Sequence, residues 1–340
     1  MIQINVFFNS ALAHFNQLFC GLELLKREKE ISVKYQYAPN LKMYGGIIKI
    51  LIDDKTAYVD VQDSNKFDKT LYEDADIYFK RMLLKTDAEK FPKLSPYGLN
   101  YSVMAENHFL KYIFLKNKKF IKLSLKYHWL LSAILNMNDS IANCYYKKFE
   151  RKPQPKLENR IVFSTRLWDP DRNDETWKKK ERKILNDQRV SIIRKLKKNY
   201  SNLFSGGIFL DPHSKRICSD IIVSKSFSDK KKYLNLLKKA TITVTNQGLE
   251  GSIGWKFAEY IANASAILTT PIDEYMLLGN LVEGTHYLSY TSEEEFLNKL
   301  ETLLNDNELR AMMMEENYKY YKTYLNPKSK VKLLIEKTIC

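Results

Sequence analysis

Two series of alternating strand-like and helix-like segments dominate this sequence. The first covers 2–82 and opens with the β-rich IQINVFF, a helical stretch at 11–26 and the alternating run ISVKYQY. The second covers 160–304 and opens with RIVFSTRLW and the helical NDQRVSIIRKLKKNY. Strands that alternate with helices are typical of a parallel sheet, because a parallel crossover needs a connection of a dozen or more residues. The pattern therefore predicts an α/β fold with a parallel sheet in each half.

A charged segment with two prolines, ERKPQPKLEN at 150–159, separates the two series. This composition is typical of a linker. A chain of 340 residues is long enough for two hydrophobic cores. We predict an N-terminal Rossmann-like domain over 1–152 and a C-terminal one over 153–314, facing each other across a cleft. The remaining helical segment, 315–340, is a candidate to complete the first domain.

Cysteine usage and hydropathy indicate a cytoplasmic protein. The four cysteines match no disulfide or metal spacing, which predicts reduced thiols. No segment approaches the roughly 18 consecutive apolar residues that a membrane span needs. The N-terminus has no basic residue ahead of its apolar part, so we expect no signal peptide. A peripheral position on the inner face of the membrane remains the alternative location.

The net charge of +15 is unevenly spread along the chain. Residues 111–152 mix ten Lys and Arg with many aromatic residues and only two acidic ones. Such a stretch suits an anionic membrane surface, single-stranded nucleic acid, or a helical pair packed on the N-terminal sheet. Of the two binding roles we expect the membrane surface, and we expect no nucleic acid.

The segment NQGLEGSIGWKFAEYIANASAILTTP, at 246–271, is the strongest candidate for a site. Three glycines precede a helix predicted to begin near 252–254: Gly248, Gly251 and Gly254. The N-terminus of a helix favours an anion, and glycines allow a phosphate to approach closely. Lys256 and Glu259 follow on one helix face. The alternative is that the glycines only permit close packing and that Lys256 and Glu259 form an exposed ion pair.

The spacing of these glycines matches neither the dinucleotide fingerprint nor the P-loop. The order of glycine loop, helix with Lys and Glu, the strand AILTTP, LVEGTHYLSY and an acidic helix instead resembles the donor-binding domain of GT-B glycosyltransferases. It is most similar to bacterial enzymes that build capsule, lipopolysaccharide and other surface glycans. The resemblance covers about 155–325. It implies transfer of a sugar from a nucleotide-diphosphate sugar to a glycan or lipid-linked acceptor, with no cofactor and no metal.

The resemblance also implies roles for individual residues. Glu259 matches the glutamate that binds the ribose, and Arg166 matches the basic residue that reaches the diphosphate. Lys256 and the glycine loop would hold the diphosphate as well. Further polar residues beside these segments are predicted to contact the donor: Asn246, Gln247, Ser252 and Glu283. Arg189 could point into the cleft from the start of a helix.

The catalytic base is predicted in the N-terminal half. His14 follows the first strand, and its placement is similar to that of a histidine base in some inverting members of the family. A neutral imidazole suits this role near pH 7. Asp63 and Asp60 are rival bases, and the alternative for His14 is a packing role. Retaining members carry two glutamates eight positions apart, whereas Gly251 stands eight before Glu259, so inversion is slightly favoured.

Acceptor contacts are predicted for Lys80 and Arg81, at the end of ADIYFKRM, and for Asn100 in PKLSPYGLNY. The triplets at 74–76 and 169–171 have the DxD pattern of a metal site in another glycosyltransferase fold, and we expect both to be incidental.

Two other functions remain open at this stage. A nucleic-acid-binding protein without catalysis would use 111–152 and bind with a strong salt dependence. A sugar-nucleotide epimerase of the same fold would convert its substrate without an acceptor.

Overall fold

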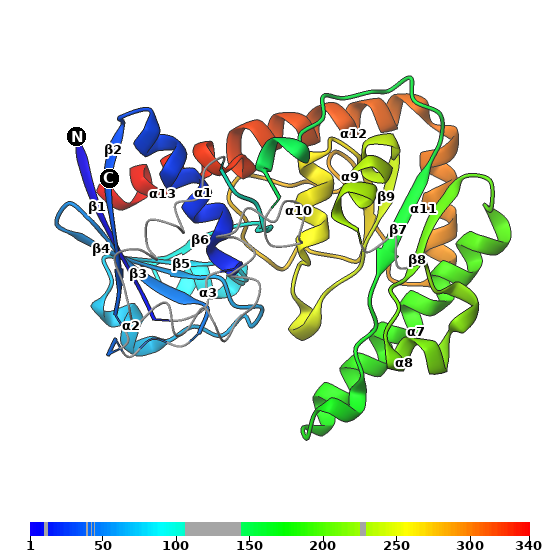
Figure 1. Ribbon diagram of the computed structural model, residues 1–340, viewed down its shortest axis with the longest axis horizontal. Coiled ribbons are helices and arrows are strands. Elements are labelled where there is room, and N and C mark those ends of the chain that lie inside the picture. The colour runs from blue at the N-terminus through cyan, green and yellow to red at the C-terminus, as the bar shows by residue number, and fades with distance from the viewer. Residues whose placement is uncertain (10–12, 39, 42, 44, 106–143, 225–228) are drawn as a thin grey trace. The chain divides into compact units, whose positions relative to one another are not determined.

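The computed structural model describes residues 1–9, 13–38, 40–41, 43, 45–105, 144–224 and 229–340. The chain divides into two compact units. The first comprises Met1–Lys148, Ile272–Asn280 and Tyr320–Cys340, and the second comprises Phe149–Pro271 and Leu281–Lys319. Each unit is built on its own β-sheet (Figure 1). The predicted α/β class, with a sheet in each half of the chain, is confirmed.

The sheet of the first unit has six strands in the order β2-β1-β3-β4-β5-β6. They are β1 (Ile2–Phe8), β2 (Ile31–Tyr37), β3 (Ile47–Ile52), β4 (Lys55–Asp60), β5 (Ile77–Lys80) and β6 (Leu94–Pro96). Strand β3 is antiparallel to both neighbours, while all other pairs are parallel. The prediction of a wholly parallel sheet is wrong here, because only Asp53 and Asp54 separate β3 from β4. A two-residue connection makes a hairpin, and Asp53 has the positive φ of 51° that such turns need.

Helices cover both faces of this sheet. Helices α1 (Asn16–Arg27) and α13 (Pro327–Ile339) pack together on one face and share a core with β1–β4. A Cβ atom on Gly21 of α1 would lie 2.1 Å from the carbonyl oxygen of Pro327, so the two helices approach this closely because position 21 is a glycine. The short helices α2 (Lys69–Asp74) and α3 (Lys85–Lys90) cover a second core built around Tyr58 and Tyr78. The C-terminal helix thus belongs to the first unit.

The sheet of the second unit is entirely parallel, in the order β11-β10-β9-β7-β8. Its strands are β7 (Ile161–Thr165), β8 (Phe204–Ile208), β9 (Ile242–Val244), β10 (Ala266–Thr269) and β11 (Leu288–Ser289). The first strand, β7, lies between β8 and β9, so the chain reverses its direction of growth there. In such sheets ligands bind at the carboxyl ends of the two strands that flank the reversal. These are β7 and β9.

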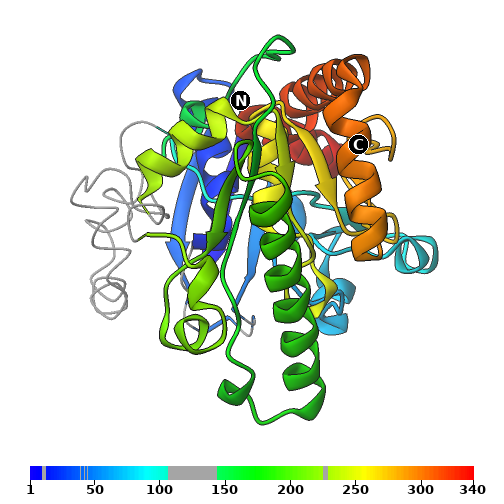
Figure 2. The same ribbon diagram turned by 90° about the vertical axis from the view of Figure 1, so that its right-hand side faces the viewer.

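Helices α7 (Thr176–Asn199) and α11 (Glu293–Asn305) lie on one face of this sheet, as Figure 2 shows. Lys195 of α7 pairs with Glu293 of α11 at 3.1 Å. Helices α9 (Lys230–Lys239) and α10 (Trp255–Ala262) lie on the opposite face. The connections β8 to β9 and β9 to β10 run along the sheet in the direction opposite to that from β7 to β8, and right-handed crossovers in opposite directions use opposite faces. Asn263 joins these two helices by donating from Nδ2 to the carbonyl of Leu237 at 2.8 Å. Helix α7 begins ten residues before the predicted 186 and takes in the charge run at 178–183.

In the described part of the chain, no helix has the length and apolar character needed to cross a membrane.

Arg151 ties the start of the second unit to two of its turns. Its buried guanidinium donates to the carbonyl oxygens of Lys238 (2.8 Å), Ala240 (2.8 Å) and Ala264 (3.2 Å). We expect Arg151→Met to lower the free energy of unfolding by about 2–4 kcal/mol, because three buried acceptors lose their donor. The exposed neighbour gives the matched control, since Lys152→Met should change it by less than about 0.5 kcal/mol. Urea denaturation measures both, and equal effects would contradict the role given to Arg151.

Candidate functional site

The side chain of Arg189, on α7, joins the carboxyl ends of β7 and β9. Its Nη1 donates to the carbonyl of Arg166 at 2.8 Å, and its Nη2 donates to the carbonyl of Gln247 at 3.0 Å. Its Nε donates to Oδ1 of Asn246 at 3.0 Å. None of these acceptors is a carboxylate. Burial lowers the pKa of Arg189 to about 10, which still leaves the guanidinium charged at neutral pH. Arg189 therefore braces the ends of the two strands and puts a positive charge there.

Two more cations lie beside this brace. The exposed guanidinium of Arg166, directly after β7, lies 5.6 Å from the ring centroid of Trp168. The half-buried ammonium of Lys256, in the first turn of α10, lies 4.3 Å from the ring centroid of Tyr233 and 5.7 Å from that of Phe209. Aromatic faces attract cations but carry no net charge. Within the described residues neither cation forms an ion pair.

The pKa of Lys256 is lowered by burial and by the cations around it. Burial lowers this pKa to about 8, and although Glu259 opposes the shift, Lys230, Arg166 and Arg189 increase it. The four cations therefore influence one another. An anion bound among them would relieve this repulsion.

Glu259 is the carboxylate that faces these cations from α10. Lys230 of α9 pairs with its Oε1 at 3.0 Å, and the hydroxyl of Tyr233 donates to its Oε2 at 2.6 Å. Glu259 is 7% exposed and Lys230 is 6% exposed. Burial by itself would raise the pKa of Glu259, but Lys230, Lys256 and the bond from Tyr233 hold it below its ordinary value.

This arrangement corrects two expectations about Glu259. The sequence placed it beside Lys256 on an open helix face, either as a ribose ligand or in an exposed ion pair. Its carboxylate is instead buried between α9 and α10, with both oxygens occupied, and its ion partner is Lys230. An open carboxylate that accepts two sugar hydroxyls is therefore wrong for this structure.

The three glycines of the loop have different roles. Gly248 allows a tight turn, since a Cβ there would lie 2.6 Å from Oγ of Ser252. Gly251 has a φ of +69°, which favours glycine. A Cβ on Gly254 would meet nothing within 4 Å, and Gly254 caps α10 without a side-chain bond. The space beside Gly254, at the N-terminus of the helix, is therefore open.

The loop is not α-helical where the spacing of the two family glutamates was considered. Glu250 has a φ of +57°, and its N–H donates to the carboxylate of Glu181 on α7. Glu250 lies one position before Gly251, which stands eight positions before Glu259. Because the backbone at Glu250 is not α-helical, this one-residue difference does not correspond to a turn around a helix axis. The stereochemistry of transfer stays a prediction.

The other predicted donor contacts are used inside the protein. Asn246 accepts from Arg189 and donates from Nδ2 to Gln188 at 2.9 Å, and Ser252 is 2% exposed. A donor contact by either side chain is therefore wrong in this arrangement. Glu283 is exposed, but its Oε1 accepts from the backbone and hydroxyl of Ser289 and pairs with Lys299 at 3.0 Å.

The first unit has a second cluster, at the carboxyl edge of its sheet. Asp63 follows β4, Arg81 follows β5, and the two form an ion pair. Asn100, which follows β6, donates from Nδ2 to the carbonyl of His14 at 2.8 Å. Partial burial lowers the pKa of His14, while the charge of Asp63 opposes this shift and Arg81 adds to it. The exposed imidazole of His14 is thus neutral at pH 7.

A buried pair lies under this cluster. Asp60 and Lys80 are 1% and 0% exposed at their side chains and lie 3.0 Å apart, and the hydroxyl of Tyr78 donates to Asp60 at 2.9 Å. A direct acceptor contact for Lys80 and a catalytic role for Asp60 are therefore wrong, because solvent reaches neither. Arg81 and Asn100, each 2% exposed, point inward as well, so their predicted acceptor contacts are not available.

Sequence patterns did not reveal Lys230 or Lys330. Lys230 is one of three consecutive lysines, and only its burial distinguishes it from Lys231 and Lys232. Lys330, on α13, is 1% exposed and donates to the carbonyl of Leu99 at 2.6 Å.

No group of three or more potential metal ligands occurs among the described residues. In the first DxD triplet, Asp74 pairs with Lys49 at 2.9 Å and Asp76 accepts from the backbone of Thr56 at 2.7 Å. In the second, Asp169 caps a short 3₁₀ helix.

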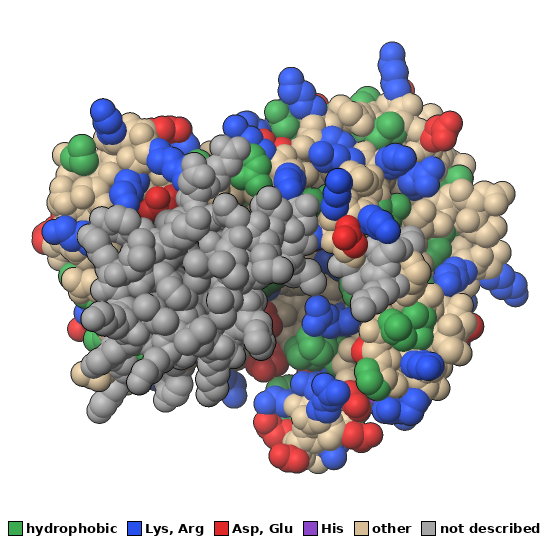
Figure 3. Space-filling view, in the orientation of Figure 1, with side chains coloured by type: hydrophobic (Ala, Val, Ile, Leu, Met, Phe, Trp, Pro, Cys, Tyr) green, Lys and Arg blue, Asp and Glu red, His purple; other side chains and the backbone are tan. Residues whose placement is uncertain are grey.

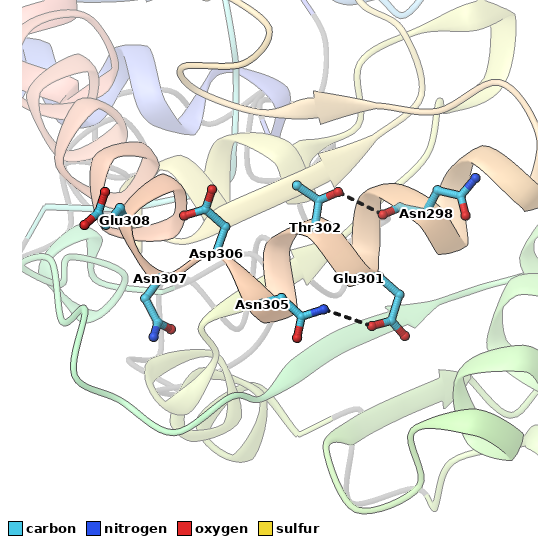
Figure 4. A pocket seen from close by; sticks show the side chains of 7 residues that line it. All are labelled: Asn298, Glu301, Thr302, Asn305, Asp306, Asn307 and Glu308. Atoms are coloured by element: carbon cyan, nitrogen blue, oxygen red, sulfur yellow. Dashed lines mark hydrogen bonds between the residues drawn. The ribbon is translucent and has the colours of Figure 1, made fainter.

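A hollow of about 770 Å³ lies where α11 ends and α12 (Asn307–Tyr320) begins (Figure 4). Amide and acidic side chains line it, among them Glu301, Asp306 and Glu308. Because α11 starts beside the carboxyl end of β11 and runs back along the sheet, the hollow lies at the opposite edge from the ends of β7 and β9. It takes no part in the cationic site.

The stretch at 111–152, predicted to face an anionic membrane, lies outside the described residues up to position 143.

Several solved structures of glycosyltransferases are similar to this chain. The C-terminal domain of LpcC, a glycosyl transferase group 1 family protein from Francisella tularensis, is 15% identical over 53% of this chain and 97% of its own, with a TM-score of 0.35. WaaG, a glycosyltransferase involved in lipopolysaccharide biosynthesis, is 11% identical over 98% of this chain and 97% of its own, with a TM-score of 0.39. An α1,3-fucosyltransferase is 10% identical over 99% and 90%, with a TM-score of 0.40.

No family model and no curated protein matches the sequence. The similar structures named here are described as glycosyltransferases. At these identities and TM-scores, the roles of the residues rest on the geometry of this chain alone.

The pair formed by Lys230 and Glu259 predicts strong coupling. We expect Glu259→Gln to lower the free energy of unfolding by about 3–5 kcal/mol, because it leaves the buried ammonium of Lys230 without a counter-charge. The double variant Lys230→Met/Glu259→Gln should lose less than the summed losses of the single variants Lys230→Met and Glu259→Gln. Glu283→Gln, which breaks the exposed pair with Lys299, should cost below about 1 kcal/mol. Denaturant titration of these four variants and the wild type measures the losses. If the losses of Lys230→Met and Glu259→Gln add up in the double variant, the pairing is contradicted.

Proposed function

We propose that this chain is a glycosyltransferase whose second unit binds a nucleotide-diphosphate sugar. The observation that carries the proposal is the charge imbalance at the carboxyl ends of β7 and β9. Arg166, Arg189, Lys230 and Lys256 influence one another there, and Glu259 is paired with one of them. A diphosphate carries about two negative charges and would complete this set.

The residues divide into those that would touch the diphosphate and those that hold the site. The exposed Arg166 and the half-buried Lys256 have no ion partner among the described residues, and Gly254 leaves the N-terminus of α10 open. These three would bind the phosphates. When the sugar is transferred, charge develops on the departing nucleoside diphosphate, and the same cations would stabilise it. Arg189, Lys230 and Glu259 would act as positioning residues.

The cluster in the first unit would serve the acceptor. His14 presents a neutral imidazole, and the nearby Asp63 favours its protonated form once it has taken a proton. This suits a general base that removes the proton of an acceptor hydroxyl in an inverting displacement. The acceptor would be a glycan or lipid-linked sugar of a bacterial surface polysaccharide such as capsule or lipopolysaccharide.

Binding of the donor can be measured without knowing the sugar. UDP, GDP, TDP and CDP are screened for an increase in melting temperature, and at least one should stabilise the protein. Lys256→Met should lower the affinity for that nucleotide by about 10-fold or more, because a charge-assisted contact is lost. Lys179→Met, on the exposed face of α7, is the matched control and should bind like the wild type. The absence of stabilisation by all four nucleotides would refute the proposed donor site.

The low pKa of Lys256 predicts a pH dependence of nucleotide affinity. Below about pH 8 this lysine is already charged. Above that value binding must take up a proton, so affinity should fall by up to tenfold per pH unit. Lys256→Arg stays charged throughout, and its affinity should not fall between about pH 7.5 and pH 9. Isothermal titration with CDP, whose base does not ionise in this range, measures both, and equal slopes would contradict the assignment.

The base role of His14 predicts the acid limb of the pH–rate profile. Because the pKa of His14 lies below 6.5, kcat/KM should stay level down to that pH and fall below it. His14→Asn should lower kcat by about 10²–10⁴-fold. Asp63→Asn removes a charge that raises the pKa of His14, so its acid limb should move to lower pH. Consumption of the nucleotide sugar without any acceptor would indicate an epimerase instead.

A further inference from the structure

Helix α9 carries a row of exposed lysines on the side that faces away from the sheet. Four members make up this lysine face: Lys231, Lys232, Lys238 and Lys239. At 100° per residue they fall within about one third of the helix circumference, together with the exposed Asn235. The other side of α9 carries Tyr233, Leu234 and Leu237, which are buried. The fold therefore fixes the direction in which the lysines point.

None of the four lysines forms an ion pair within the part of the chain that the structure describes. The exposed Lys152 lies beside the C-terminal end of the same helix, because Arg151 binds the carbonyls of Lys238 and Ala240 there. Asp229, the N-cap, is the acidic residue next to the helix, and its carboxylate accepts from the backbone of Lys232. Figure 3 shows Lys and Arg side chains gathered over the place that α9 has in Figure 1.

The proposed donor site does not use this surface. Lys230 is turned inward to Glu259, whereas the four lysines are exposed. Lys238 and Lys239 lie in the last turn of α9, where a cation complements the helix dipole, whereas Lys231 and Lys232 lie in the first turn, where it does not. A row of cations held in one direction is complementary to a flat anionic surface.

We propose that the lysine face of α9 docks on the surface of an anionic lipid membrane. The described part of α9 exposes no large hydrophobic side chain, so the contact is electrostatic and reversible rather than inserted. The cations of the lysine face are all lysines, and it has no arginine, which would bind phosphate by two hydrogen bonds. It also has no exposed aromatic ring on which a base could stack. These features favour a lipid headgroup layer over a nucleic acid. The proposal does not depend on the glycosyltransferase function.

Vesicle binding tests the proposal. The wild-type protein should sediment with vesicles of phosphatidylcholine and phosphatidylglycerol at low salt, but not with phosphatidylcholine alone. Each lysine near an anionic surface strengthens binding about fivefold, so changing all four to Gln should weaken it by about 100-fold or more. The matched control changes four exposed lysines of α7, on the opposite face of the sheet, to Gln: Lys179, Lys180, Lys183 and Lys198. This control should bind the vesicles almost as the wild type does.

Three results would overturn the proposal: no binding of the wild type to anionic vesicles, retained binding in the α9 variant, or an equal loss in the α7 control. A parallel titration with duplex DNA at the same salt gives a fourth. If the α9 variant loses affinity for DNA while its vesicle binding is unchanged, the surface serves a nucleic acid instead. The melting temperatures of both variants should equal that of the wild type, since all eight side chains are exposed.

Discussion

The buried guanidinium of Arg189 is the constraint on which the second unit depends. It has no carboxylate partner and is held by two strand-end carbonyls and one amide oxygen. A buried charge is tolerated only where such acceptors are fixed around it. Arg189 thus locks the ends of β7 and β9 together, and the segments that follow these strands, with Arg166 and the glycine loop, start from this point. The brace positions the site and at the same time makes it positive.

The two units differ in whether their cations are paired with carboxylates. In the first unit Lys80 pairs with Asp60, and Arg81 pairs with Asp63. Asp63 and Arg81 shift the pKa of His14 in opposite directions. In the second unit the cations outnumber the carboxylate, and this excess is suited to an anionic ligand. The same residue types are thus paired in one unit and present in excess in the other.

Local sequence signals predicted some elements closely and others poorly. Helix α2 spans Lys69–Asp74 as expected, with Asp68 as its N-cap. Strands β3 and β4 coincide with the β-rich runs GIIKILID and TAYVDVQDS, but the antiparallel direction of β3 was missed, although the two residues between these strands were a hairpin signal. The apolar period of helix α7 begins only near 186, and the charge run at 178–183 belongs to the same helix, as expected of a solvated helix face. The partners of Glu259, which are Lys230 and Tyr233, were not anticipated.

The sequence by itself determined the α/β alternation, the glycine at the start of α10, Arg166 directly after β7 and Lys256 in the first turn of α10. Each of these depends on residues that are neighbours in the chain. Only the tertiary structure decided that Glu259 binds Lys230, 29 positions away, and that Lys256 is left without an ion partner among the described residues. The physical reason is that α9 and α10 pack side by side on one face of the sheet. This packing determines that Lys230 is buried and Lys231 and Lys232 are exposed, which local periodicity cannot distinguish.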